Sequence, residues 1–306
     1  MNGRIQSSGD LIADRRYEWA RGLADDGDFD AAAELLADVV MLAPGFAAAW
    51  FALGEAREKL GDRAAAVAAF EQARAADPLD AHGAAVRLAR LGALPPVAMP
   101  IGYIQSLFDG YAPKFETSLV GNLGYRGPQI LLDAVKRALD EPVHFAHAVD
   151  LGCGTGLAGE TFRPFCGSLT GVDLSPGMLA LARGKNVYDR LEAAEAMTFL
   201  GAVPEASLDL ILAADVFIYF HELIQIGAPA ARALKPGGVL AFSVETHDSD
   251  GVILRDTLRY AHSESHVRQA IAAGGLELRA LQTAWARHEK GAEVPGLVVV
   301  ARSLSC

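Results

Sequence analysis

Apolar runs and amphipathic stretches alternate along the second half of the chain. The short apolar runs, which predict buried strands, lie near 145–151, 168–173, 187–192, 207–214 and 237–244. The stretches between them have helical periodicity, so the pattern predicts an α/β protein with a doubly wound sheet. A further helix is expected to begin near Ser263. Two later apolar runs predict a hairpin, Leu276 to Ala286 and Leu297 to Ala301, joined by the polar segment His288 to Pro295.

The first ninety residues have a helical pattern that repeats with a period of 34. Gly27-Asp28 returns as Gly61-Asp62, and the same spacing relates Ala32 to Ala66, Leu36 to Phe70 and Pro44 to Pro78. A period of this length is typical of stacked helical pairs. The second copy resembles a tetratricopeptide repeat in its pattern of small and large residues, which are Trp50, Leu53, Gly54, Ala66, Phe70, Ala73 and Pro78. The first copy departs from that pattern at Trp19 and Ala20, and Ala84 to Leu91 is interpreted as a capping helix.

A segment rich in glycine and proline separates the two halves. Gly92 to Pro96 and Pro100 break the helical periodicity and mark a linker. The pattern then becomes amphipathic from Ile104 to Phe115, and Pro128 to Leu139 predicts a helix with proline in its first turn. We therefore expect helical repeats over 13–91, a linker over 92–102 and a second domain over 103–303.

Composition and charge narrow the range of partners. The net charge is −11, and acidic residues outnumber basic ones in both halves, which disfavours a nucleic-acid partner. Cys153, Cys166 and Cys306 are too far apart in sequence to suggest a zinc site or a disulfide framework. No apolar stretch approaches the roughly 20 residues of a membrane span. We expect a cytoplasmic protein with no membrane partner, acting on a small molecule or a protein.

The loop Asp150 to Gly156 is the most informative motif. It reads Asp-Leu-Gly-Cys-Gly-Thr-Gly after an apolar run, and its three glycines allow a ligand and a helix to approach the backbone closely. Asp173 ends the second predicted strand, where a carboxylate can accept both ribose hydroxyls of an adenosine. Leu157 stands where a dinucleotide site would have its last glycine, so the spacing weakens a nicotinamide interpretation. These residues predict an adenosine cofactor.

Three later stretches, together with this loop, occur in the order that a known family has its motifs. They are Gly171 to Ser175, Asp209 to Ala214 and Leu234 to Leu240, and with the loop they resemble the motifs of class I S-adenosylmethionine-dependent methyltransferases. The resemblance implies a seven-stranded doubly wound methyltransferase sheet with an antiparallel last strand, preceded by a small all-α tetratricopeptide-like domain. The stretches Phe108 to Phe115 and Arg259 to Ser263 further resemble a bacterial group of predicted methyltransferases containing tetratricopeptide repeats.

The resemblance also implies a set of residues that bind S-adenosylmethionine. Asp173 would hold the ribose, Asp150 would orient the glycine loop and the ammonium end of the cofactor, and Leu174 would pack on the adenine. Glu195 and Ala196 take the place of an aspartate near the adenine amino group, with Glu192 as an alternative. The other implied contacts are the loop residues Gly152, Cys153, Gly154 and Gly156, the small strand-end residues Ala213 and Ala214, and, toward the methionine carboxylate, Tyr111 and Arg126.

The acceptor and the catalytic residues stay unassigned by the sequence. A sulfonium methyl group is already activated, so holding donor and acceptor in line can carry much of the rate without an obligatory base. Asp215, Tyr219 and His221 follow the fourth strand, and none of them is singled out. The prediction is methyl transfer to an O or N acceptor, with the helical repeats recruiting a protein partner or the substrate. Two alternatives stay open: a scaffold that binds the cofactor without turnover, and an NAD-dependent oxidoreductase.

Overall fold

The computed structural model describes residues 7–117, 124–139, 143–289 and 291–304. The chain divides into two compact units, Met1–Gly110 and Tyr111–Cys306. Within the described part of the chain, no helix combines the length and the apolar character needed to cross a bilayer.

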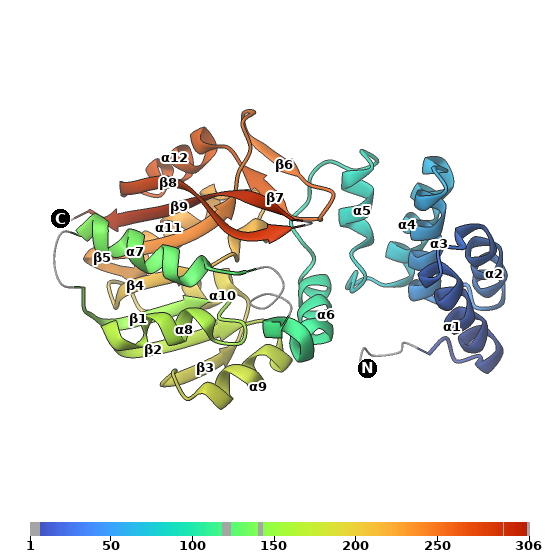
Figure 1. Ribbon diagram of the computed structural model, residues 1–306, viewed down its shortest axis with the longest axis horizontal. Coiled ribbons are helices and arrows are strands. Elements are labelled where there is room, and N and C mark those ends of the chain that lie inside the picture. Colours follow the sequence, from blue (N-terminus) through green and yellow to red (C-terminus); the bar gives the residue numbers. More distant parts are fainter. Residues whose placement is uncertain (1–6, 118–123, 140–142, 290, 305–306) are drawn as a thin grey trace. The chain divides into compact units, whose positions relative to one another are not determined.

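Helices joined by turns and loops make up the described residues of the first unit (Figure 1). Its helices are α1 (Leu11–Asp25), α2 (Phe29–Leu42), α3 (Ala47–Lys59), α4 (Arg63–Ala76), α5 (Ala84–Arg90) and most of α6 (Ile101–Tyr111). Helix α6 begins three residues before the amphipathic pattern that predicted it. Its first turn is closed by the Pro100 carbonyl, which accepts a hydrogen bond from the Ile104 amide at 3.1 Å.

The 34-residue repeat is visible in the two turns that start α2 and α4. Gly27 and Gly61 both adopt positive φ, at 84° and 78°. The aspartate after each glycine caps the next helix: Asp28 accepts the Ala31 amide at 3.1 Å, and Asp62 accepts the Ala65 amide at 3.0 Å. Glycine reaches this backbone region without strain, and a side-chain oxygen satisfies a free helix amide. The two sequence copies therefore build the same turn.

Helices α3 and α4 pack at a contact between a glycine and an aromatic ring. Phe70 on α4 is fully buried, and a Cβ placed on Gly54 of α3 would lie 2.6 Å from its ring atom Cε1. The pattern of small and large residues in the second repeat copy therefore corresponds to a close contact in which the Phe70 ring packs against the backbone at Gly54.

A nine-stranded sheet forms the centre of the described part of the second unit. Strands β1 (Phe145–Leu151), β2 (Cys166–Asp173), β3 (Arg190–Ala193), β4 (Leu208–Ala213) and β5 (Leu234–Glu245) are parallel in the order β3-β2-β1-β4-β5. Strand β9 (Ala292–Ser303) lies antiparallel to β5, and β8 (Leu276–Glu289) pairs with β9. These seven strands have the predicted methyltransferase arrangement, with an antiparallel last strand.

Two features of the sheet differ from the pattern expected from the sequence. The strands of the hairpin run through most of the polar segment His288 to Pro295, because the antiparallel ladder continues to the pairs His288 with Glu293 and Glu289 with Ala292. A second, short hairpin of β6 (Val252–Leu254) and β7 (Tyr260–His262) extends the sheet at the end of β5, where Glu245 pairs with Ala261. The sequence pattern did not predict it.

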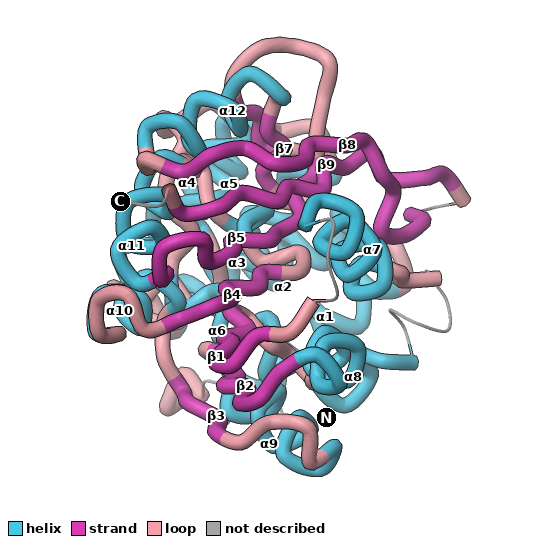
Figure 2. Tube along the Cα trace, turned by 90° about the vertical axis from the view of Figure 1, so that its left-hand side faces the viewer, coloured by secondary structure: helices cyan, strands magenta, loops and turns pink. Residues whose placement is uncertain are grey.

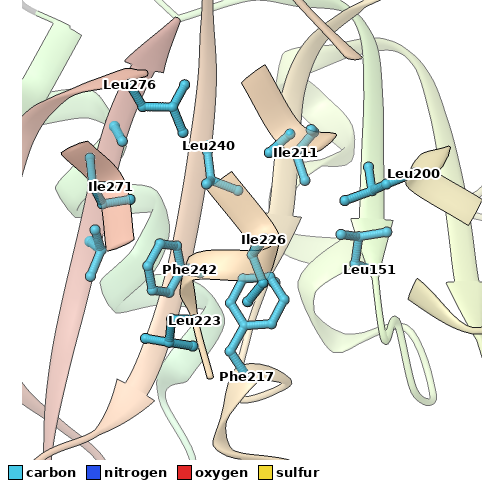
Figure 3. Packing of buried hydrophobic residues seen from close by; sticks show 14 of the residues in the cluster. Leu151, Leu200, Ile211, Phe217, Leu223, Ile226, Leu240, Phe242, Ile271 and Leu276 are labelled. Atoms are coloured by element: carbon cyan, nitrogen blue, oxygen red, sulfur yellow. The ribbon is translucent and has the colours of Figure 1, made fainter. Parts of the chain in front are cut away.

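Helices cover both faces of the sheet, as the doubly wound pattern predicted. Helices α7 (Gly127–Leu139) and α8 (Leu157–Phe162) lie on one face, and α10 (Ala196–Ala202), α11 (Ile224–Ala233) and α12 (Glu264–Ala273) lie on the other (Figure 2). Helix α9 (Pro176–Lys185) follows β2. Figure 3 shows the core under the second group, where Leu200, Ile226 and Ile271 from the three helices meet strand residues such as Ile211 and Leu240. Both faces are therefore closed, and the carboxyl ends of the parallel strands are the edge at which this topology places ligands.

Candidate active site

The glycine loop connects β1 to α8 at the carboxyl edge of the sheet. Gly152, Gly154 and Gly156 have φ values of 63°, 53° and 96°, a region that favours glycine. A Cβ on Gly152 would lie 2.5 Å from Val216, whereas one on Gly154 would meet no atom within 4 Å. The backbone at Gly154 therefore faces open space, into which a ligand can approach.

Asp173 lies beside this loop at the end of β2. One carboxylate oxygen accepts the Gly154 amide at 2.9 Å, and the other accepts the Ser175 amide at 2.8 Å. The loop is also tied to β2 through its backbone, because the Cys153 amide donates to the Val172 carbonyl at 2.9 Å. Each carboxylate oxygen has more than one lone pair, so Asp173 retains acceptor capacity while it shapes the loop.

Asp150 lies at the bottom of the same loop, on β1, and is 1% exposed. The Tyr188 hydroxyl donates a hydrogen bond of 2.6 Å to its carboxylate. Burial raises the pKa of Asp150 to about 7, and the nearby Asp173 carboxylate adds to the rise, while the Tyr188 hydrogen bond opposes it. Burial likewise raises the pKa of the Cys153 thiol far above its usual range, so this thiol is a neutral filler of the loop.

The remaining predicted contacts near the adenosine lie at the ends of β2, β3 and β4. Leu174 directly follows Asp173 and is half-buried. Glu195 is the N-cap of α10, and its carboxylate accepts the amides of Met197 and Thr198 at 2.9 and 2.6 Å. Ala196 begins that helix. Ala213 ends β4, fully buried, and the half-buried Ala214 follows it.

Arg126 lies against the β8–β9 hairpin. Its guanidinium carbon lies 4.7 Å from the ring centre of Trp285 on β8, and its amide donates to the Ala286 carbonyl at 2.8 Å. Tyr111 lies at the end of α6, edge-on to Phe115. The roles predicted for Arg126 and Tyr111 toward the methionine carboxylate stay predictions.

The segment 111–117 is fastened to the region of the glycine loop by an ion pair. The Lys185 ammonium at the end of α9 lies 2.7 Å from Glu116 and 2.6 Å from Glu160 of α8. Partial burial acts to raise the pKa of Glu116, but the Lys185 contact outweighs it and holds this pKa below its ordinary value. Lys185 of α9 therefore links the segment 111–117 to α8, the helix that follows the glycine loop.

A buried charged cluster lies beyond the end of β4. Arg287 of β8 is 5% exposed and pairs with Glu245 at the end of β5 and with Asp215, at 3.1 Å. Asp215 has a positive φ of 57°, and its carboxylate also accepts the Ser243 hydroxyl at 2.8 Å. Arg255 and Arg259 each lie 3.2 Å from Glu245. The carboxylates and guanidiniums thus compensate one another, as buried charges require.

A small opening, with a cavity volume of about 20 Å³, adjoins this cluster. It lies between the start of α7, the ends of β4 and β5, and the β8–β9 hairpin, and its lining combines apolar side chains with the polar groups of Asp215, Ser243, Glu245 and Arg287. Because Asp215 is two residues beyond Ala213, the opening is next to the strand end predicted to contact the cofactor. The sequence named Asp215 without singling it out and gave no signal for Arg287, which is 72 residues from Asp215.

Two other histidines of the second unit, His247 and His262, are held by hydrogen bonds within the fold. His262 is fully buried on β7, and its Nε2 lies 2.9 Å from the Phe220 carbonyl. Burial lowers the pKa of His262 to about 4, so it is neutral at physiological pH. His247 contacts Ser249 at 2.7 Å and the Gly251 carbonyl at 3.2 Å, within its own loop. Both are engaged in structural hydrogen bonds.

Two protein families match the chain in the regions that the geometry singles out. A methyltransferase domain family matches residues 149–242, which run from the end of β1 into β5 and include the glycine loop, and a tetratricopeptide repeat family matches residues 23–91. The chain therefore carries an S-adenosylmethionine-dependent methyltransferase domain with an N-terminal tetratricopeptide region. This confirms the predicted class, its cofactor and the repeats. The match and the antiparallel β9 both argue against the oxidoreductase alternative.

Curated relatives resemble part of the chain. Methyltransferase-like protein 27 of Homo sapiens is 33% identical over 144 residues, which cover 47% of this chain and 58% of the relative. The malonyl-[acyl-carrier protein] O-methyltransferase of Serratia marcescens is 29% identical over 163 residues, which cover 51% of this chain and 61% of the relative. The chain thus spans about three fifths of the length of these relatives.

Solved structures share the fold. The 1,6-didemethyltoxoflavin-N1-methyltransferase of Burkholderia thailandensis has a TM-score of 0.52 at 19% identity, covering 69% of this chain and 93% of that one. The [4+2]-cyclase SpnF also has a TM-score of 0.52, at 16% identity, and the match covers 66% of this chain and 97% of SpnF. Since one of these proteins is named as a cyclase, the fold alone does not fix the reaction.

Proposed function

We propose that the chain transfers a methyl group from S-adenosylmethionine to an O or N acceptor. The observation that carries this proposal is the open backbone at Gly154 beside the Asp173 carboxylate, in a domain of the methyltransferase class. Asp173 holds the ribose hydroxyls, Asp150 faces the ammonium end, and the small Ala213 leaves room at the end of β4. Bound there, the cofactor supplies an activated methyl group.

The residues around the opening next to Asp215 orient the acceptor. Its mixed apolar and polar lining suits the hydroxyl or amine group of a small-molecule or protein acceptor that reaches this opening. Closing apolar surface over the reacting atoms excludes water, and holding donor and acceptor in line converts the transfer into an effectively unimolecular step. A relative named as a malonyl-[acyl-carrier protein] O-methyltransferase is consistent with an O acceptor, including one carried on a protein.

The tetratricopeptide region recruits a protein partner or the substrate in this proposal. Its support is the repeat family match over 23–91 and the exposed apolar side chains of α1, where Leu11, Ile12 and Trp19 are 78%, 60% and 67% exposed. These side chains precede the matched repeats in sequence, and apolar groups left exposed on a helix are available for a protein contact.

Calorimetric titration with S-adenosylmethionine tests the cofactor site. Asp173→Asn keeps the shape of the side chain but removes its charge and replaces one acceptor oxygen by a donor. Because each hydrogen bond to a charged group contributes about 1.5–3 kcal/mol, the loss of one ribose contact should weaken binding by about 10- to 100-fold. The matched control is Asp209→Asn, because this carboxylate also accepts a backbone amide, that of His147 at 2.8 Å, but lies where β4 begins. Equal affinity in the Asp173 variant and the wild type would refute the site.

A labelled-methyl experiment tests turnover and the class of acceptor. The wild-type chain and Asp173→Asn are incubated with cell extract and methyl-labelled S-adenosylmethionine. Label that enters macromolecules or small metabolites only with the wild type supports transfer, and the fraction that contains it defines the acceptor class. Binding without any transfer, together with retention of a protein partner by both variants, would favour the scaffold alternative.

A further inference from the structure

Tyr188 is the residue around which the cofactor loop is packed. It lies between α9 and β3, and its ring faces three glycines from three elements. A Cβ on Gly156 would lie 3.2 Å from ring atom Cε2, and one on Gly171 of β2 would lie 3.0 Å from Cδ1. A Cβ on Gly159 of α8 would overlap the ring outright. Each glycine therefore leaves space that the tyrosine ring fills.

The chain on either side holds this ring in place. Asn186 ends α9 in the left-handed conformation, with φ at 54°, which turns the chain back toward the sheet. Asp189 then fastens the segment to β2: its amide donates to the Leu169 carbonyl at 2.9 Å, and its carboxylate accepts the Leu169 amide at 2.7 Å and pairs with Arg163 at 2.6 Å. The Tyr188 hydroxyl is thereby fixed 2.6 Å from Asp150.

We propose that Tyr188 is a positioning residue of the cofactor site, which keeps the Asp150 carboxylate ionised and aimed at the glycine loop so that it can attract the cationic end of S-adenosylmethionine. The inference rests on the proposed function. Tyr188 itself touches the loop and Asp150, and acts on the cofactor through them. It belongs to none of the four sequence motifs that indicated the family.

The surroundings of Asp150 make its charge sensitive to pH. The groups that face it are Tyr188, the Asp173 carboxylate on β2, the thiols of Cys153 and Cys166, and, beyond the end of the strand, Tyr125. Burial raises the pKa values of both thiols and of both tyrosines, so these groups stay neutral through neutral pH. Asp150, with a pKa of about 7, changes charge there.

Calorimetric titration with S-adenosylmethionine from pH 5.5 to pH 9 tests the proposal. Wild-type affinity should fall as the pH is lowered through about 7, because Asp150 becomes neutral. Tyr188→Phe keeps the ring and removes the hydroxyl, and losing a hydrogen bond to a charged group should move the midpoint up by about one to two pH units. Asp150→Asn should abolish this transition. The ligand's own amino group titrates identically with every variant, so differences between variants report on the protein.

The controls separate this inference from the proposed function. Tyr17→Phe also removes a tyrosine hydroxyl, one that accepts a hydrogen bond from Arg21 at 3.1 Å in the first unit, and should leave the profile unchanged. Two results would overturn the positioning role while leaving the proposed function standing, provided that the wild type binds the cofactor. One is a pH midpoint of affinity in Tyr188→Phe equal to that of the wild type, and the other is a pH transition that survives in Asp150→Asn. Absence of wild-type binding at every pH would overturn both.

Discussion

The buried charged cluster around Glu245 makes a quantitative prediction about stability. The Glu245 and Arg287 side chains are 4% and 6% exposed, and Glu245 also lies 3.2 Å from both Arg255 and Arg259. Removing one partner of a buried pair leaves an uncompensated charge, which costs about 3–5 kcal/mol. Glu245→Ala should therefore lower the free energy of unfolding of the second unit by that amount.

A double-mutant cycle separates loss of the pair from loss of packing. Arg287→Met alone should also destabilise, because Glu245 and Asp215 lose a shared partner. Glu245→Gln alone leaves the guanidiniums without their carboxylate and should destabilise as well. Combining Arg287→Met with Glu245→Gln removes both charges, so the double variant should lose less than the sum of these two single variants, with a coupling of about 2 kcal/mol.

Urea unfolding followed by tryptophan fluorescence measures these changes. The chain has three tryptophans, and replacing Trp19 and Trp50 by Phe leaves Trp285, two residues from Arg287, as the reporter of the second unit. The control is Glu277→Ala, which breaks the exposed pair with Arg279 and should change stability by at most about 1 kcal/mol. A loss below 1 kcal/mol in Glu245→Ala, or strict additivity in the cycle, would refute the reasoning.

Two further predictions concern His262 and Gly54. The pKa of His262 is about 4 in the folded chain and near 6.5 when unfolded, so the unfolded state binds the proton first and the contribution of this residue to stability is lost as the pH drops below about 6.5. Asp150, whose pKa rises to about 7 on folding, has the opposite pH dependence, so the comparison is made between variants. In urea unfolding the wild type should lose about 2 kcal/mol more than His262→Gln from pH 7 to pH 5, and equal pH slopes in the two chains would contradict this. Gly54→Ala should destabilise the first unit by about 1–3 kcal/mol in calorimetry, because its Cβ meets the buried Phe70 ring, and Phe70→Leu should relieve the clash; a stabilised Gly54→Ala chain would contradict the packing.

Local patterns predicted the features that depend on a few consecutive residues. The period of 34 located the turns at Gly27 and Gly61, and the alternation of apolar runs predicted the five parallel strands to within a few residues. The glycine loop and Asp173 meet as expected, because carboxyl ends of neighbouring parallel strands share an edge.

Features that depend on distant contacts were not predictable in this way. Tyr188 was expected near the start of a strand, yet it lies before β3 and contacts glycines from three elements. Arg126 lies over Trp285, a pairing between residues 159 positions apart that no periodicity encodes. The three-residue strands β6 and β7 are too short to give an alternating signal, and the polar residues after His288 form strands because backbone pairing supplies their hydrogen bonds.

The matching aspartate-capped turns at Gly27 and Gly61 bear on how the helical array can grow. Each turn is closed by hydrogen bonds within its own copy, so every copy contains the residues that end one helix and start the next. Stability in stacked arrays is close to a sum of units and nearest-neighbour interfaces. A duplicated stretch of 34 residues inserted ahead of α5 would therefore present to α5 the same neighbour that it meets now, and length could be gained in whole copies while the capping helix stays unaltered.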